Sequence, residues 1–300
     1  MARYVGIDLG GTAIKAGACD ENGTILERRS IATGLEDGAA AVLDRMAQLA
    51  SELGAKSRVG VGAPGLIDLE AGRVLSSPNL KVLEGVLLRD EIARRLGFAS
   101  ANIKLGNDAN CAALGEYWIG AGKGERDMLM VTLGTGVGGG LVIEGQMYAG
   151  PGGMAGEIGH VCIEPKGPKC GCGRSGCVEM YASATAAQRR ALSLGLPREN
   201  PGDLALLSSL ARERAGPERD LMFDIGRDLG HGLATAVSLL DLRCFVIGGG
   251  FGAATDVLTP GIRAGINERS YGDRLANVRI VPALLGADAG WIGSARLSAS

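Results

Sequence analysis

The feature that most constrains the fold is an apolar run that ends in a glycine-rich turn, a pattern that occurs three times. The runs at residues 4–11, 127–140 and 243–252 each suit a buried strand and close in two or more glycines. Glycine lets the backbone bend sharply at a strand end and leaves room for a ligand against the main chain. Strand-like and helical segments alternate around these runs. The pattern predicts an α/β protein with two related domains.

The spacing of apolar residues and the turn signals predict the individual elements. Strands are expected at residues 4–11, 13–20, 24–33, 58–68, 102–108, 127–140, 140–150, 243–252 and 278–286. Helices are expected at residues 37–53, 87–97, 108–120 and 289–299, and residues 181–240 are expected to be largely helical.

The length of the chain favours two domains, because 300 residues are comfortable for two cores and long for one. We expect a smaller N-terminal α/β domain at residues 1–112, which a C-terminal helix at about 288–300 completes. Residues 113–287 are expected to form a larger α/β domain that carries a cysteine-rich loop.

Charge and hydropathy argue against two classes of protein. The formal net charge is −2 and no basic run occurs, so no nucleic-acid-binding surface is expected. No stretch reaches the roughly 18 uninterrupted apolar residues of a membrane span, and the first residues lack the pattern of a signal peptide. We therefore expect a cytoplasmic protein that binds neither nucleic acid nor membrane.

The three turns, at residues 8–12, 133–140 and 248–252, could hold a phosphate-rich ligand. Glycines at strand ends let backbone N–H groups approach a phosphate, and a threonine hydroxyl adds a donor. Residues 134–139 formally match the dinucleotide motif, but that motif needs a following helix and residues 140–150 read as a strand. A Walker A loop does not occur. The sequence therefore argues against both a Rossmann site and a P-loop.

One short loop contains four of the seven cysteines and one of the two histidines. In a cytoplasmic protein a disulfide framework is not expected, and one residue between Cys170 and Cys172 does not fit the thioredoxin motif. Structural zinc takes four tetrahedral nitrogen or sulfur ligands. Cys170, Cys172 and Cys177 could supply three of them, and either His160 or Cys162 could supply the fourth.

Four motifs, in this order, resemble the ROK family of sugar kinases and repressors. They are DLGGT at residues 8–12, LGTGVGGG at 133–140, EIGH at 157–160 and CGCGRSGCVE at 170–179. The resemblance covers essentially the whole chain, and its last two motifs together are highly specific. It implies the actin-like ATPase fold, with two ribonuclease-H-like domains around a cleft that binds ATP. The phosphates would lie against the first two turns and the nucleoside near the third.

The resemblance indicates a kinase rather than a repressor. ROK repressors carry an additional N-terminal helix-turn-helix, whereas the first strand is expected here from about residue 3. The run from EIGH to CGCGRSGCVEMYAS is most similar to bacterial glucokinases. The expected activity is ATP-dependent phosphorylation of a hexose, with glucose giving glucose 6-phosphate. Kinases for N-acetylmannosamine, fructose or other hexoses are the alternative, followed by a non-catalytic sugar-responsive regulator.

The resemblance also assigns roles to residues. Asp108 is the expected general base, although the residues alone equally allow a helix N-cap, a role that Asn107 could take. Asp8 is expected near a Mg²⁺ that bridges the β- and γ-phosphates. The residues expected at the sugar are Asn79, Asn107, Asp108, Glu157, His160 and Glu179, with Gly65 nearby. Those expected at ATP are Asp8, Gly10, Gly11, Thr12, Gly134, Thr135, Gly136, Gly138, Gly249 and Gly250.

The same resemblance selects His160 as the fourth zinc ligand, beside Cys170, Cys172 and Cys177, and leaves Cys162 as a small buried residue. A site with four protein ligands has no open position, so the zinc is expected to be structural. Cys19, Cys111 and Cys244 are expected in the core, and His231 in a helix. Family members are often dimers or tetramers, so a homodimer or homotetramer is expected. ATP is the expected phosphate donor, with polyphosphate or ADP as alternatives.

Overall fold

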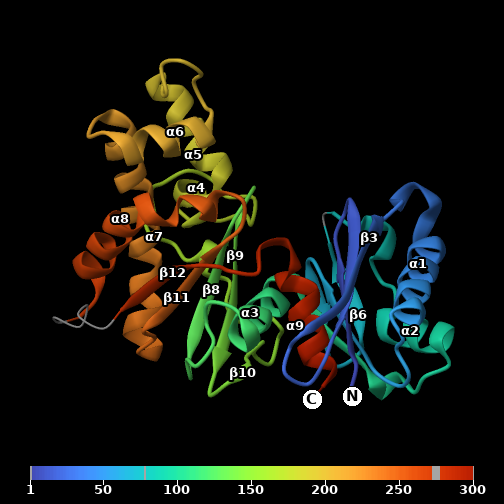
Figure 1. The fold of residues 1–300 in the computed structure, drawn as a ribbon. Helices are drawn as coiled ribbons and strands as arrows, with labels where there is room; N and C mark the ends of the chain where they lie inside the picture. Colours follow the sequence, from blue (N-terminus) through green and yellow to red (C-terminus); the bar gives the residue numbers. More distant parts are fainter. Residues whose placement is uncertain (1, 78, 272–277, 300) are drawn as a thin grey trace. The chain divides into compact units, whose positions relative to one another are not determined.

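The computed structural model describes residues 2–77, 79–271 and 278–299, and the chain divides into two compact units (Figure 1). Unit 1 consists of Met1–Arg126, Gly140–Gly156 and Leu284–Ser300, and unit 2 of Asp127–Gly139 and Glu157–Ala283. In this division residues 113–126 and 140–156 group with the N-terminal part of the chain. The domain boundary expected at residue 112 stays a prediction.

The first five-stranded sheet lies in unit 1 and has the strand order β3-β2-β1-β4-β7. Strands β1, β2 and β3 form an antiparallel meander, and β1, β4 and β7 are parallel neighbours. Their bounds are Tyr4–Leu9, Ala13–Cys19, Ile25–Ala32, Val59–Ala63 and Ile103–Asn107. Because β1, β4 and β7 run parallel, their carboxyl ends meet at one edge of the sheet. Asp8 and Asn107 lie at that edge.

The helices of unit 1 are α1 at Gly38–Glu52, α2 at Leu88–Leu96, α3 at Asp108–Ile119 and α9 at Ala289–Ser298. A short hairpin, β5 at Leu66–Asp68 and β6 at Arg73–Ser76, lies between α1 and α2 in the sequence. Ile7 of β1, Met46 of α1 and Ile92 of α2 are fully buried members of one hydrophobic core. That core forms because α1 and α2 turn their apolar faces to the sheet.

Helix α9 packs directly on β1 and β4, and glycine makes this close approach possible. A Cβ atom added at Gly6 would lie 2.0 Å from the backbone oxygen of Trp291, and one at Gly60 would lie 1.7 Å from that of Ser294. No side chain fits at either position, so the helix backbone rests on the strands themselves. Figure 1 shows α9, in red, beside the blue strands of the N-terminal sheet. The last helix of the chain thereby completes the first sheet's unit.

The second five-stranded sheet has the order β10-β9-β8-β11-β12. Its bounds, in chain order, are β8 Met128–Leu133, β9 Val137–Ile143, β10 Gln146–Met147, β11 Cys244–Gly248 and β12 Arg279–Pro282. Strands β8, β11 and β12 are parallel neighbours, while β9 and β10 form an antiparallel hairpin. Each five-stranded sheet therefore combines antiparallel strands on one side with three parallel strands on the other.

The helices of unit 2 are α4 at Glu179–Ala182, α5 at Ala184–Leu194, α6 at Leu204–Glu213, α7 at Pro217–Leu240 and α8 at Thr255–Arg269. Helices α7 and α8 pack closely, because glycines face each other: a Cβ atom at Gly230 or at Gly265 would lie 3.0 Å from the other's Cα. No described helix is both long and apolar enough to cross a membrane.

Candidate active site

The cysteine-rich loop of unit 2 gathers four side chains whose chemistry suits a metal. One ligand atom from each of His160, Cys170, Cys172 and Cys177 lies within 4.8 Å of all the others. The Sγ of Cys170 is 3.7 Å from Nδ1 of His160, and the Sγ atoms of Cys172 and Cys177 are 3.6 Å apart. A set of one imidazole and three thiolates is a common donor set for structural zinc. The cluster is therefore compatible with zinc.

Cys162, the alternative fourth ligand, does not belong to this cluster. Its thiol donates to the backbone oxygen of Ser175 at 3.3 Å, and the side chain is exposed. The expectation that Cys162 is a small buried residue is wrong. Its backbone pairs with that of Cys177 in an isolated antiparallel bridge.

The two glutamates that bracket the loop lie beside the same cluster. The Nε2 of His160 is 3.9 Å from a carboxylate oxygen of Glu157, so the two ring nitrogens of His160 face different partners. The carboxylate of Glu179 accepts from the thiol of Cys170 at 3.6 Å and from the backbone N–H of Val137 at 3.1 Å. Glu179 therefore links the cysteine loop to the second glycine turn.

Asn107 and Asp108 lie in unit 1 at the junction of β7 and α3, and Asn107 caps the helix. Its side-chain oxygen accepts from the backbone N–H groups of Ala109 and Asn110, at 2.9 and 3.4 Å, and its amide nitrogen donates to the backbone oxygen of Gly65 at 3.1 Å. Because Asn107 satisfies these orphan donors, α3 does not need the carboxylate of Asp108 as its cap. Burial raises the pKa of Asp108, and a hydrogen bond from the backbone N–H of Ala109 opposes that shift.

Asp8 lies near the end of β1, immediately before the first glycine turn. Burial, and after it the negative charge of Asp108, raise the pKa of Asp8 to about 6, while the positive charge of Lys15 opposes this shift. The following turn is closed by the backbone bond from Gly10 N–H to the oxygen of Ala13, at 3.0 Å. The carboxylates of Asp8 and Asp108 repel one another, because little solvent screens their charges. This edge of the sheet therefore has an excess of negative charge.

Asn79 lies against the same turn. A Cβ atom added at Gly11 would be 3.3 Å from the backbone oxygen of Asn79. Thr12, the last residue of the turn motif, is exposed, and its backbone oxygen accepts from the N–H of Thr33 at 3.0 Å. The structure therefore brings Asn79 into contact with the turn that follows Asp8.

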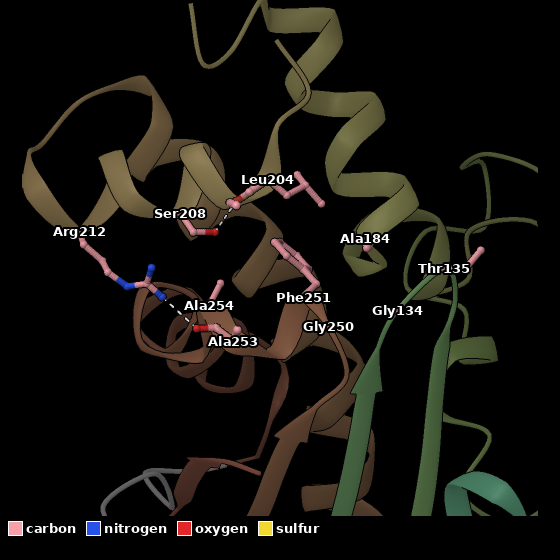
Figure 2. Close-up of a pocket in the computed structure, with 11 residues that line it drawn as sticks. Gly134, Thr135, Ala184, Leu204, Ser208, Arg212, Gly250, Phe251, Ala253 and Ala254 are labelled. Carbon is pink, nitrogen blue, oxygen red and sulfur yellow. Dashed lines mark hydrogen bonds between the residues drawn. The ribbon is translucent and has the colours of Figure 1, made fainter. Parts of the chain in front are cut away.

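The second and third glycine turns border a cavity of about 430 Å³ in unit 2 (Figure 2). Its lining residues are Gly134, Thr135, Ala184, Leu204, Ala205, Ser208, Arg212, Gly250, Phe251, Ala253 and Ala254. Most of these side chains are apolar or small, and the backbone of the second glycine turn forms one side. Such a lining suits the flat, largely apolar faces of a nucleoside.

Arg212 forms the polar edge of that cavity. Its guanidinium pairs with the carboxylate of Asp256, at 2.7 Å between Nε and Oδ2, and donates to the backbone oxygen of Ala253 at 2.9 Å. Figure 2 shows this contact joining α6 to the segment after the third turn. Gly249 adopts a φ of +80°, and a Cβ atom there would meet the backbone of Leu133 at 2.4 Å. These contacts hold the two turns and the cavity wall together.

Comparison with known proteins decides the family. The ROK family pattern matches residues 4–300. The chain belongs to the ROK family. A glucokinase from Thermotoga maritima is 34% identical over 98% of this chain and 96% of its own length. An N-acetylmannosamine kinase from Escherichia coli O9:H4 is 34% identical over 84% of this chain and 84% of its own.

A solved structure supports the same assignment and the fold. The crystal structure of a ROK family glucokinase from Streptomyces griseus, in complex with glucose and AMPPNP, is 35% identical with a TM-score of 0.79 and covers 99% of each chain. Together with the two sheets, this likeness confirms that the ROK protein has the actin-like ATPase fold.

Sequence reasoning missed several residues of the ROK protein's cavity. Leu204, Ser208 and Arg212 lie on α6, far in sequence from the glycine turns, and no motif marks them. Phe251 lies within the third turn and could have been found from its position. The expected residue Gly138 lies within β9 and does not line the cavity.

Proposed function

We propose that this ROK protein is an ATP-dependent hexose kinase, with glucose as its substrate and glucose 6-phosphate as its product. The observation that carries the proposal is the pair of half-buried carboxylates, Asp8 and Asp108, beside the first glycine turn. Phosphoryl transfer needs a proton acceptor for the attacking hydroxyl and positive charge at the phosphates. The carboxylate of Asp108 suits the first need as a proton acceptor. The carboxylate of Asp8 suits the second, because it can hold a cation near the phosphates. The related glucokinase that was solved with glucose and AMPPNP supports the choice of substrates.

Asp108 is the proposed general base. Asn107 already caps α3, which leaves the carboxylate of Asp108 to accept the proton of a sugar hydroxyl. Burial raises the pKa of Asp108, and a carboxylate with a raised pKa is a stronger base once it has lost its own proton. The proton would pass to Asp108 as the hydroxyl oxygen bonds to the γ-phosphorus, while the bond from that phosphorus to the β–γ bridging oxygen breaks and ADP leaves.

Asp8 is the residue that we propose to lie near Mg²⁺. The site fits a cation, because the buried carboxylate of Asp8 has a pKa raised by burial and by the charge of Asp108, and a bound cation would reverse both effects. When bound, Mg²⁺ neutralises charge on the β- and γ-phosphates. The turn residues Gly10, Gly11 and Thr12 would offer backbone donors to the phosphates in unit 1.

In unit 2 we propose that the second and third turns bind the nucleotide. Gly134, Thr135 and Gly136 would meet phosphate oxygens, and Gly249 and Gly250 would lie near the nucleoside. The cavity beside these turns has the volume and the apolar lining for the nucleoside.

We propose that the sugar's remaining hydroxyls are bound by Asn79 and Asn107 in unit 1 and by Glu157, His160 and Glu179 in unit 2. Each hydroxyl both donates and accepts, so a mixture of carboxylates, amides and an imidazole suits it. Zinc held by His160 and the three cysteines would be structural and would fix the loop that carries these side chains.

A kinase for N-acetylmannosamine is the second candidate, because the Escherichia coli enzyme of that name is as similar in identity as the glucokinase. A panel of hexoses, measured by ATP-dependent release of ADP, separates the two. We expect the highest kcat/KM with glucose. A higher value with N-acetylmannosamine or fructose would overturn the choice of sugar, and no ADP release with any sugar would overturn the kinase.

Formation of the sugar phosphate, measured with polyphosphate or ADP in place of ATP, tests the phosphate donor. We propose ATP as the donor, and faster turnover with polyphosphate would contradict it. We further propose a cytoplasmic homodimer or homotetramer. Light scattering after gel filtration tests the oligomer, and a monomer at micromolar concentration would overturn it.

A further inference from the structure

Glu116 is a buried carboxylate to which the proposed reaction gives no role. It lies on α3 in unit 1, and its side chain is 0% exposed. A buried carboxylate is tolerated where several hydrogen-bond donors surround it. The hydrogen-bond partners of Glu116 therefore indicate which segments of the chain it holds in place.

The carboxylate of Glu116 accepts three backbone N–H groups from two separate segments. Oε2 accepts from Ala121 at 2.8 Å and from Leu284 at 3.1 Å, and Oε1 accepts from Leu285 at 2.7 Å. Hydrogen bonds to an ionised acceptor are roughly twice as strong as those between neutral groups. Both oxygens of one side chain thus tie Leu284 and Leu285 to the end of α3.

These two residues begin the last return of the chain to unit 1, which starts at Leu284. The return continues through a 3₁₀ helix at Gly286–Asp288 into α9. Leu285 also packs against the hydrophobic cluster that contains Trp118 and Trp291. The anchor of Glu116 therefore lies only a few residues before the first turn of α9.

The first turn of α9 lies against Asp8. A Cβ atom added at Gly290 would be 2.7 Å from the Cγ and Oδ2 atoms of Asp8. Lys15, the antiparallel neighbour of Asp8 on β2, donates to the backbone oxygen of Ala287 at 3.4 Å. The segment that Glu116 anchors thus meets Asp8 directly at Gly290 and through Lys15.

We propose that Glu116 is a positioning residue, which anchors Leu284 and Leu285 to α3 and thereby sets the first turn of α9 against Asp8. The proposal deepens the proposed function and rests on the role given there to Asp8. Glu116 does not touch a substrate. Through Asp8, Glu116 affects the part of the site that is proposed to bind the phosphates. Asn107 and Asn79, which are proposed to bind the sugar, are held in place by other contacts.

Hydrogen exchange tests the anchor without any activity. Glu116→Gln keeps the shape of the side chain but replaces one acceptor oxygen with a donor that faces backbone N–H groups. We expect exchange at Ala121, Leu284 and Leu285 to become at least tenfold faster, with unchanged exchange in β1 and β4. Glu144→Gln is the matched control, because Glu144 pairs with Arg126 on the surface. Equal exchange at these three amides in Glu116→Gln and in the unaltered protein would overturn the anchor.

Tryptophan fluorescence tests whether the anchor reaches α9. The chain has two tryptophans, and Trp291, on the first turn of α9, is 1% exposed. We expect Glu116→Gln to shift the emission maximum to longer wavelength, because a looser start of α9 admits water to Trp291. An unchanged spectrum would overturn the step from Glu116 to α9.

Steady-state kinetics test the step to Asp8. We expect Glu116→Gln to lower kcat at least fivefold and to raise KM for ATP at least fivefold, with glucose affinity changed less than twofold. Gly290→Ala should give the same split, since its added methyl meets the Asp8 carboxylate. A lower melting temperature of Glu116→Gln with unaltered kinetic constants per active site would show that Glu116 only stabilises the fold. That result would overturn the step from Glu116 to Asp8. If the unaltered protein phosphorylates no sugar, the proposed function fails, while exchange and fluorescence still decide the anchor.

Discussion

At the scale of single residues, Asn107 and Asp108 show how adjacent side chains divide two tasks. The amide of Asn107 caps α3 and holds the backbone of Gly65, while the carboxylate of Asp108 shares the N–H of Ala109 with that cap. A helix cap alone would account for either residue in the sequence. The hydrogen bonds of Asn107 make the catalytic role of Asp108 the more economical proposal.

Replacement of Asp108 tests that role. We expect Asp108→Asn to lower kcat by about 10²- to 10⁴-fold, the usual contribution of a general base, with glucose affinity nearly unchanged. A coupled assay of ADP release gives kcat, and calorimetry gives glucose affinity. Asp44→Asn, at an exposed carboxylate on α1, is the control and should retain full activity. Near-normal turnover of Asp108→Asn would contradict the assignment of the base.

At the scale of elements, the cysteine loop is a segment without regular structure that a metal would hold in shape. We expect about one zinc per chain, and we expect Cys172→Ser to lose it, because the serine oxygen is a poor replacement for a thiolate. The loss should lower the melting temperature and raise KM for glucose, since His160 carries one ring nitrogen toward the cysteines and the other toward Glu157.

Elemental analysis and thermal unfolding measure these effects, and Cys162→Ser provides the control. Cys162 is exposed and lies outside the cluster, so its replacement should leave zinc content and KM unchanged. Zinc-free protein with normal glucose affinity would argue that the loop keeps its shape alone.

The packing of α9 on β4 gives a second prediction for elements. Gly60→Ala would place a methyl group 1.7 Å from the backbone oxygen of Ser294, so helix or strand must move. We expect the free energy of unfolding to fall by about 3 kcal/mol or more, at the upper end for overpacked cores. Gly152→Ala, where an added Cβ atom meets nothing within 4 Å, is the control. Urea unfolding of both variants measures the difference, and equal stability would contradict direct backbone packing.

Elements with clear periodicity could be predicted from the sequence, and elements stabilised by distant partners could not. The helix expected at residues 37–53 is Gly38–Glu52, because its apolar residues repeat at helical spacing. Helix α8, at Thr255–Arg269, was not predicted, since Pro260 and two glycines interrupt its pattern. It is stabilised by close packing on α7, which no local signal reveals. The region 181–240, expected to be largely helical, contains the end of α4 and the helices α5, α6 and α7.

The residues of the candidate site also fall into those that the sequence predicts and those that it does not. Residues inside compact motifs, such as Asp8, Asp108 and the ligand cluster of the cysteine loop, could be found from spacing and resemblance. Glu116 and Arg212 could not, because their partners lie far away in the sequence, at Leu284 and Asp256.

At the scale of the whole molecule, the buried carboxylate of Asp8 makes stability depend on pH. Its pKa is about 6 in the folded chain and 3.8 as the ordinary value, so between these pH values the folded state binds more protons than the unfolded state. Stability therefore falls as pH rises through this window, by about 3 kcal/mol in total. We expect Asp8→Asn to remove this loss, and so to be more stable than the unaltered protein at pH 7.5 while losing activity.

Urea unfolding at pH 5 and pH 7.5, followed by tryptophan fluorescence, measures the effect, because both tryptophans belong to unit 1. Asp20→Asn is the contrasting variant. Backbone hydrogen bonds, that of Thr24 foremost, lower the pKa of Asp20, so its carboxylate favours the folded state at neutral pH. An equal loss of stability between the two pH values in Asp8→Asn and in the unaltered protein would contradict the assignment to Asp8.

The direct packing of α9 on β1 and β4 also has a consequence for the synthesis of the chain. More than two hundred residues separate the end of β4, at Ala63, from the start of α9, at Ala289. At about 5–20 residues per second, a ribosome needs roughly 10–45 seconds to cover that distance. Throughout this time the part of the first sheet around Gly6 and Gly60 lacks the helix that covers it in the folded chain. The nascent chain must keep that face from other polypeptides until its last helix arrives.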